Sequence, residues 1–390
     1  MTGKTVCVLG GGSGGVVVAN LLRKYLDPPH EIILVDKNPE HVYAPSFLWV
    51  LAGKRRPAEI KKSLHSLERK GIRFINSEVK KILPDKNLVR VNDEEITYDY
   101  LIVALGAESN MNAISGLNEA AINLYSLEGI LQLKEQLEDF NRGELVILIP
   151  SMPYKCPAAP YEAAFILDSQ FRKKQFRDEV NISIYTFETL PMPTAGPQIG
   201  QMLKELLGKR AINFNPGIAV ESINPENKEV IFKDGSKKRA DLLITIPPHK
   251  SPDVVKEALL TNEAGWMPVD KKTLKTEYNN IFAIGDIATI KLEGKYKPDK
   301  PLMLPKAGVF AHKEAHVVAK NIASEIKGTF EQKEFDGKGS CFLELGNGVA
   351  GFAAGSFFEL PHPKVNMKKP SRFWLYLKIL FEKYWLRRWF

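Results

Sequence analysis

The sequence predicts an α/β protein with two doubly wound units, each with a parallel sheet, and a C-terminal amphipathic helix. Three observations predict it. A glycine-rich segment lies between an apolar strand and a helix near the N-terminus, apolar strands alternate with helices along most of the chain, and aromatic and basic residues gather in residues 373–390. Strands that alternate with helices are typical of parallel sheets covered on both faces.

The composition is that of a globular protein with more than one domain. The chain has 390 residues, 44% hydrophobic and 26% charged, so it is neither disordered nor fibrous. Its three cysteines, Cys7, Cys156 and Cys341, are too few for a disulfide framework and lack metal-ligand spacing, so we expect no metal site. No apolar run predicts a membrane-spanning helix. No charged and apolar leader follows Met1, so we expect no signal peptide and favour the cytoplasmic side.

The net charge of +8 is concentrated at one end of the chain. Residues 364–390 contain eight lysines and arginines but a single acidic residue, Glu382, and they also contain many aromatic residues. Proteins that bind nucleic acid usually spread positive charge over the body of a domain. We therefore expect no nucleic-acid partner.

The first 36 residues contain a complete dinucleotide-binding fingerprint. The pattern predicts a strand over residues 4–9, a helix over 16–25 and a second strand over 31–35, with a G-x-G-x-x-G run after the first strand. Asp36 stands at the end of the second strand. Strand, glycine run, helix, strand and terminal acid in this order predict a Rossmann-like unit.

Each glycine of the fingerprint has its own physical reason. Gly10 permits the tight turn, Gly12 lets the backbone approach a pyrophosphate, and Gly15 lets the helix pack closely on the strand. The helix N-terminus offers unpaired N–H groups to the anion. Asp36 would accept hydrogen bonds from the ribose hydroxyls of an adenosine.

Two later segments indicate which dinucleotide binds. Residues 98–106 (YDYLIVALG) form a strand that runs into small residues, and residues 280–286 (NIFAIGD) form a strand that ends in Gly285 and Asp286. With the fingerprint, these segments resemble the FAD-binding motifs of the disulfide-reductase-like FAD/NAD(P)-binding fold. The resemblance implies that Asp286 reaches the ribityl or phosphate portion of FAD.

The inserted region is also α/β, but it lacks a second glycine fingerprint. We predict strands over residues 144–149, 181–187, 218–223, 228–232 and 241–246, helices over 161–172 and 198–209, and a hairpin turn at Asp234 and Gly235. The strand 144–149 runs into residues 150–157, which contain no glycine. A pyrophosphate has no cradle there, which argues against a nicotinamide cofactor.

A cysteine stands where the second fingerprint would be. Cys156 precedes a helix that Pro160 can begin, and the positive end of that helix would favour its thiolate. Cys341 lies in a strand-like run, residues 339–343, after a long predicted helix over 306–327. Spacing alone does not bring the two cysteines together.

Four segments resemble the sulfide:quinone oxidoreductase family: PYKCPAAPYEAA around Cys156, residues 305–322, the Cys341 strand and the tail KILFEKYW. The resemblance covers nearly the whole chain. It implies that Cys156 and Cys341 form a redox pair beside FAD, attacked by hydrosulfide, with Cys341 carrying the persulfide and Cys156 facing the flavin. The electrons then pass to a membrane quinone.

The resemblance also implies roles for other residues. Glu162 is a candidate proton acceptor, and Lys306 would stabilise negative charge on reduced flavin. Many members carry a third cysteine in the region matching residues 121–126, and this chain has none, so we expect FAD to be bound non-covalently. We expect Cys7 to be buried and inert, and His312 and His316 to be ordinary helix residues. The other residues expected to contact FAD are Ser13, Lys37, Pro45, Val79, Ala104 and Gly106.

The tail predicts an amphipathic helix over residues 373–390. Lys378, Glu382, Lys383 and Arg387 fall on one face at helical spacing, with aromatic residues on the remainder, so we expect the helix to lie on the surface of a lipid bilayer. A helix docked on the protein's own core or on a sister subunit is the alternative. By resemblance, Phe381 packs against the quinone ring and Lys378 lies near its carbonyl.

These features define the expected organisation. Residues 1–112 and 238–328 form an FAD-binding domain, 113–237 a second Rossmann-like domain, and 329–390 a C-terminal region with the Cys341 strand and a peripheral membrane helix. Alternatives are a sulfide dehydrogenase subunit that reduces a cytochrome c partner, a type II NADH:quinone dehydrogenase-like flavoprotein, and a non-catalytic flavoprotein. The sequence leaves a homo-oligomer open.

Overall fold

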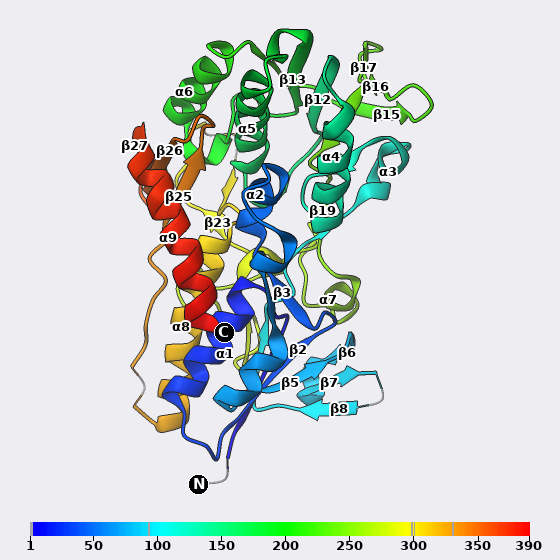
Figure 1. Cartoon of the computed structure of the whole chain (residues 1–390). Coiled ribbons are helices and arrows are strands. Elements are labelled where there is room, and N and C mark those ends of the chain that lie inside the picture. The colour runs from blue at the N-terminus through cyan, green and yellow to red at the C-terminus, as the bar shows by residue number, and fades with distance from the viewer. Residues whose placement is uncertain (1–2, 93, 298, 300, 330) are drawn as a thin grey trace.

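Two five-stranded parallel sheets form the two halves of the molecule (Figure 1). The computed structural model describes residues 3–92, 94–297, 299, 301–329 and 331–390. The first sheet has the order β21-β9-β1-β2-β5. Its strands are β1 (Thr5–Leu9), β2 (Glu31–Asp36), β5 (Arg73–Asn76), β9 (Tyr100–Val103) and β21 (Ile281–Ala283).

The second sheet has the order β11-β18-β12-β13-β14. Its strands are β11 (Ile122–Asn123), β12 (Gly143–Ile149), β13 (Val180–Thr186), β14 (Ile212–Pro216) and β18 (Leu242–Thr245). The central strands of both sheets are almost wholly apolar and buried, as strands covered on both faces must be. The predicted α/β fold with two Rossmann-like sheets is confirmed.

Five long helices flank these sheets, and all but α4 lie close to the predicted positions; α4 was not predicted. They are α1 (Ser13–Tyr25), α4 (Leu127–Asp139), α5 (Ala159–Lys173), α6 (Pro197–Gly208) and α8 (Gly308–Lys327). α1 begins three residues earlier than predicted, because Ser13 and the glycines after it already adopt helical geometry. α8 begins at Gly308, so Lys306 lies in the loop before it.

Short strands and helices complete the two halves. Asp234 and Gly235 form the predicted turn, but the hairpin joins β16 to β17, a short polar strand that the sequence did not predict. β10 and β19 pair with each other where the chain crosses between the halves. The bounds are β3 (Glu40–Val42), β4 (Lys61–Ser63), β6 (Val79–Leu83), β7 (Leu88–Val91), β8 (Glu94–Thr97), β10 (Glu108–Ser109), β15 (Val220–Asn224), β16 (Glu229–Phe232), β17 (Lys237–Arg239), β19 (His249–Lys250), β20 (Met267–Pro268), β22 (Ala288–Thr289), β23 (Lys291–Leu292), β24 (Leu302–Met303), α2 (Phe47–Leu51), α3 (Leu117–Ala120) and α7 (Asp253–Glu257).

The C-terminal region is a three-stranded antiparallel sheet followed by a helix. The strands are β25 (Lys338–Glu344), β26 (Ala350–Ser356) and β27 (Lys364–Ser371), and the helix is α9 (Arg372–Trp389). In Figure 1, α9 runs from the level of the second half down to α1. The Asn20 side-chain amide donates a hydrogen bond to the carbonyl of Trp389, 3.1 Å away, so the last turn of α9 is docked on the first half.

The predicted polar face of the tail helix is wrong in one respect. Lys378 and Glu382 point into the protein and form ion pairs there, whereas Lys383 and Arg387 are exposed. Helical spacing groups the four residues on one face. Lys378 and Glu382 nevertheless turn inward, because partners of opposite charge on neighbouring elements pair with them. The end of α9 packs with Trp385 and Trp389 buried, as the alternative of a helix docked on its own core expects.

Candidate functional site

The carboxyl ends of three parallel strands meet at one edge of the first sheet. Gly10 follows β1, Ala104 follows β9 and Gly285 follows β21 by one residue, and these strands are neighbours in the sheet. Gly10 has a φ of 103°, and a Cβ there would lie 2.4 Å from the Ala104 carbonyl oxygen. The glycine therefore lets the turn pass over the neighbouring strand, and ligands of open α/β sheets bind at this edge.

Open space and unpaired N–H groups lie at the same edge. A Cβ on Gly12 would meet no heavy atom within 4 Å. Neither α1 nor α8 has a side chain that caps its N-terminus, and the first turns are neighbours, since a Cβ on Gly308 would lie 3.9 Å from Ser13 Oγ. Two uncapped helix N-termini favour an anion such as a pyrophosphate. This cradle fits FAD.

The adenosine end of the cradle is marked by Asp36. Its carboxylate accepts a hydrogen bond of 2.6 Å from the Gly11 N–H. The other residues predicted to contact FAD lie on several different elements. Lys37 pairs with Glu108 at 3.4 Å, Pro45 is exposed in the 3-10 helix η1 (Ala44–Ser46), Val79 begins β6, and Gly106 has a φ of 70° beside open space. Whether each touches FAD stays a prediction.

Substitutions at Gly15 and Gly12 should have different effects, the first on the packing of α1 and the second on the binding of FAD. A Cβ on Gly15 would lie 1.8 Å from the Gly10 carbonyl oxygen. We expect Gly15→Ala to displace α1 and to lower the melting temperature, by roughly 2 kcal/mol or more of stability. Gly12→Ala should leave the melting temperature of the apoprotein nearly unchanged but weaken FAD binding about tenfold or more, because the methyl group occupies the approach to the pyrophosphate. Thermal unfolding and fluorescence titration with FAD measure the two effects. Equal effects of the two substitutions would contradict this assignment.

Lys306 stands at the far end of the cradle. Its ammonium group donates hydrogen bonds to the carbonyl oxygens of Asp286 and Ala288 and lies 3.5 Å from the centre of the Trp266 ring. Burial lowers the pKa of Lys306 to about 8. Burial also raises the pKa of Asp286, and it raises that of Glu314, which accepts a hydrogen bond from the Gly285 N–H, to about 7.

Cys156 is joined to this end of the cradle through its backbone. Its N–H donates to the Lys306 carbonyl at 2.7 Å, and its carbonyl accepts from the Tyr125 hydroxyl at 2.9 Å. Its φ of 48° lies in the left-handed region, which is uncommon for a residue with a side chain. The loop therefore holds the thiol in a conformation that its surroundings must stabilise.

The two distant cysteines share one electrostatic environment. Burial raises the pKa of the Cys156 thiol well above its ordinary value, and negative charge on Cys341 and Glu162 raises it further. Cys341 is an exposed residue of β25. Desolvation by the surrounding protein, with a contribution from the negative charge of Glu162, nevertheless raises the pKa of its thiol to about 12. Lys378 lowers both values. We expected the positive end of α5 to favour the Cys156 thiolate, but burial outweighs it.

Glu162 lies in the first turn of α5 and meets the C-terminal region. Its Oε1 accepts hydrogen bonds from the Glu344 N–H at 2.7 Å and from Lys378 Nζ at 3.0 Å. Lys378 also lies 3.5 Å from the Glu344 carboxylate. Ion pairs with both carboxylates raise the pKa of Lys378 above its usual range against the effect of burial.

Glu344 is a site residue that the sequence analysis missed. It is fully buried and accepts hydrogen bonds from Trp49 Nε1 at 2.5 Å and Lys54 Nζ at 2.9 Å, and charges of Lys378 and Lys54 hold its pKa below the ordinary value despite burial. Its place in β25, three residues after Cys341, was the available signal. A carboxylate in an apolar strand requires a buried partner.

The two predicted quinone residues point in different directions. Lys378 has 12% of its side chain exposed and belongs to the ion-pair network, whereas Phe381 is 46% exposed on the outer side of α9. Phe381 therefore lies outside the ion-pair network of Lys378, Glu162 and Glu344. Near Cys341, the Phe352 ring stacks on Trp374 with centroids 4.8 Å apart and contacts Phe342.

A second acid missed in the sequence lies just beyond β13. Glu188 is buried and accepts hydrogen bonds from the hydroxyls of Tyr154 and Tyr161. Its place is similar to that of Asp36, the last residue of β2, which is the second strand of the first Rossmann-like unit. In a dinucleotide-binding unit this acid holds a ribose, but here tyrosine hydroxyls take its oxygens.

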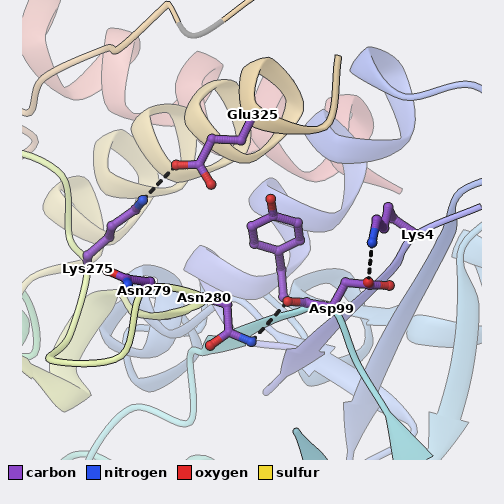
Figure 2. Close-up of a pocket in the computed structure, with 7 residues that line it drawn as sticks. Lys4, Asp99, Lys275, Asn279, Asn280 and Glu325 are labelled. Atoms are coloured by element: carbon purple, nitrogen blue, oxygen red, sulfur yellow. Dashed lines mark hydrogen bonds and ion pairs between the residues drawn. The ribbon is translucent and has the colours of Figure 1, made fainter. Parts of the chain in front are cut away.

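The remaining titratable groups and the open pocket lie apart from this site. Cys7 is buried in β1, where burial raises its pKa to about 12, and the described residues contain no group of side chains able to hold a metal. His312 and His316 pack against Trp389. An open pocket of about 440 Å³ lies at the amino ends of β1 and β9 (Figure 2), opposite the FAD edge, and its lysines pair with Asp99 and Glu325.

The fold, the FAD cradle and the cysteine pair define a flavoprotein oxidoreductase. The sequence model described as "Pyridine nucleotide-disulphide oxidoreductase" matches residues 4–148 and 162–312, and the chain belongs to that family.

Within this family the chain is similar to sulfide:quinone oxidoreductases. It is 28% identical over 354 residues to the mitochondrial enzyme of Mus musculus, covering 87% of this chain and 75% of that protein. It is 28% identical over 397 residues to the sulfide-quinone reductase of Aquifex aeolicus, covering 98% and 90%. The crystal structure of the Aquifex aeolicus enzyme superposes with a TM-score of 0.89 at 27% identity, covering 99% of this chain and 91% of that one.

A more distant relative represents one of the alternatives. The type II NADH:quinone oxidoreductase of Staphylococcus aureus (strain MSSA476) is 24% identical over 376 residues, covering 92% of this chain and 90% of that protein. The comparisons thus confirm the resemblance to the sulfide:quinone oxidoreductase family that the sequence indicates. Membership of a flavin-dependent family implies FAD as the cofactor.

Proposed function

We propose that this chain oxidises sulfide and reduces a quinone, with FAD between the two reactions. One observation carries the proposal beyond the family. Cys156 and Cys341, which are far apart in sequence, share Glu162 and Lys378 as charged neighbours, and the Cys156 backbone is bonded to Lys306 at the FAD cradle. A pair of thiols beside a flavin is the arrangement that two-electron oxidation of sulfide requires.

The first step is thiol–disulfide exchange on the oxidised Cys156–Cys341 bridge. Hydrosulfide attacks the Cys341 sulfur and the bridging bond breaks, which leaves a persulfide on Cys341 and a thiolate on Cys156. Lys378 stabilises the thiolate, since its charge lowers the pKa of both thiols. Glu162 accepts the persulfide proton, and it is held by hydrogen bonds from Lys378 and the Glu344 N–H.

The second step closes the bridge again with the new sulfur included. The electron pair leaves the Cys156 thiolate as its sulfur bonds to the outer sulfur of the persulfide. Bound FAD would supply the acceptor for this electron pair and the route by which two electrons reach the quinone. Lys306, held over Trp266, supplies positive charge at the end of the cradle nearest Cys156. We infer that FAD is bound non-covalently, because residues 121–126 contain no cysteine.

The quinone side of the proposal rests on α9. Apolar side chains Phe373, Tyr376, Leu380 and Tyr384 recur at helical spacing and are all exposed, and basic residues follow them at the end of the helix. No described helix is both long and apolar enough to span a bilayer. We infer that this exposed face lies in the bilayer surface, where a quinone can reach Phe381.

The alternatives have less support. The oxygens of Glu188 are bonded to tyrosines and the segment before α5 lacks glycine, so a nicotinamide dinucleotide has neither its ribose acceptor nor its pyrophosphate cradle. A cytochrome partner would leave the exposed aromatic face of α9 unexplained.

Anaerobic titration of the FAD-loaded protein tests the proposal. We expect sulfide to bleach the flavin absorption with a stoichiometry near one, and a quinone to restore it. NADH at the same concentration should bleach it at least a hundredfold more slowly, because the second unit lacks a dinucleotide cradle. Bleaching by NADH alone would favour the type II NADH dehydrogenase alternative, and no bleaching by either would favour the non-catalytic flavoprotein.

A further inference from the structure

Glu188 is a buried carboxylate that the proposed reaction does not use. Only 2% of the residue is exposed. It accepts a hydrogen bond of 2.8 Å from the Tyr154 hydroxyl and another from the Tyr161 hydroxyl, and the Thr186 hydroxyl lies 3.3 Å away. These contacts offset part of the cost of burying a carboxylate, which nevertheless shows in a pKa raised to about 7 by burial.

The two tyrosines lie on either side of Cys156. Tyr154 comes two residues before it, in the loop after β12, and Tyr161 comes five residues after it, in the first turn of α5. One carboxylate just beyond β13 therefore joins both ends of the segment that carries the thiol. Cys156 itself has a φ of 48°. A residue in this region persists only where the surrounding structure holds it.

An apolar side chain could fill the position of Glu188 without the cost of a buried acid. Hydrophobic packing alone, however, would not fix the direction of two phenol rings on separate segments. Hydrogen bonds to one carboxylate do so, since each phenol must meet its own oxygen.

We propose that Glu188 is a positioning residue, which holds Tyr154 and Tyr161 so that the Cys156 thiol faces the Cys341 site. Glu188 stands where a dinucleotide-binding unit has the acid that binds a ribose, and here it would hold the loop that carries Cys156. The inference rests on the proposed role of Cys156, but its test includes a measurement that does not need sulfide.

Glu188→Leu removes both acceptors, and Glu188→Gln keeps a side chain that can pair with both hydroxyls. In the reduced, FAD-loaded protein, the rate of Cys156 alkylation by iodoacetamide at pH 8 is followed by mass spectrometry. Because burial is the main cause of the raised Cys156 pKa, we expect Glu188→Leu to be alkylated about tenfold faster as the loop loosens. Sulfide-driven bleaching should slow by about tenfold to a hundredfold. Glu188→Gln should restore most of both.

Asp168→Asn is the matched control. Asp168 is another fully buried carboxylate of the same half and is bonded to Arg172, Arg177 and Arg210, none of which belongs to the Cys156 segment. Its loss should lower the melting temperature without changing the rate of Cys156 alkylation. If Glu188→Leu does not fold, Tyr154→Phe, which removes a single hydroxyl, should give a smaller change of rate in the same direction.

Two outcomes would overturn the inference. In the first, the Glu188 and Tyr154 variants keep the wild-type rates of alkylation and bleaching. In the second, Asp168→Asn changes the alkylation rate as much as Glu188→Leu does. A wild-type protein that sulfide does not bleach would instead refute the proposed function, and the alkylation rates would still decide the role of Glu188.

Discussion

Replacing Cys156 or Cys341 with serine should slow sulfide-driven bleaching of the flavin by about a thousandfold or more while FAD stays bound. Each thiol is needed for the exchange step, because serine forms neither a bridge nor a persulfide. The FAD cradle is built from β1, β9, β21 and the two uncapped helices, and serine keeps the Cys156 N–H that bonds to the Lys306 carbonyl, so FAD should stay bound. Anaerobic stopped-flow spectroscopy of the flavin measures the rate.

Cys7→Ala is the control for these variants. Cys7 is fully buried in β1, so its thiol meets no substrate, and the substitution should cost about 1 kcal/mol of stability without changing the bleaching rate. A Cys156 or Cys341 variant that bleaches at the wild-type rate would exclude the thiol pair as the route of the electrons.

Substituting serine for Phe373, Tyr376 and Leu380 together should release the protein from lipid vesicles. The three side chains are 58%, 58% and 42% exposed, so their loss should disturb the fold little. Each contributes about 1 kcal/mol or more when buried in lipid, so binding should weaken about a hundredfold or more. Co-sedimentation with vesicles that contain anionic lipid measures the binding.

The same triple variant should distinguish the access of a membrane quinone to the protein from the reduction of the quinone itself. Reduction of a long-tailed quinone in the bilayer should fall with membrane binding, whereas reduction of a short, water-soluble quinone should continue near the wild-type rate. Leu131→Ser, which removes an exposed leucine from α4, is the matched control and should change neither. A triple variant that still binds vesicles would show that another surface attaches the protein.

The fold was predictable because the inner strands and the glycines of the first unit have local signatures. The edge strand β5 was not predicted, since its four residues RFIN carry no run of buried apolar residues. Apolar runs such as 4–9 and 144–149 can be buried on both faces only in covered parallel sheets, and Gly10 and Gly15 stand where a Cβ would meet backbone. The short β17 escaped prediction because three polar residues carry no apolar pattern.

The candidate site was predictable only in part. Cys156, Glu162 and Lys306 belong to recognisable segments, but Glu344 and Glu188 gain their partners from elements far away in sequence. The orientation of Lys378 was hidden for the same reason. Helical spacing groups it with surface residues, and only Glu162 and Glu344 on other elements draw it inward.

The order of strands in the first sheet determines when during translation this sheet can be completed. β1 and β9 come early in the chain, but their neighbour β21 and the helix α8 follow the entire second sheet. The edge that receives FAD therefore remains incomplete until about three quarters of the polypeptide has been translated, by which time the strands of the inserted half are already available to pair with one another. Loading of the cofactor is accordingly a late event in the maturation of the nascent chain.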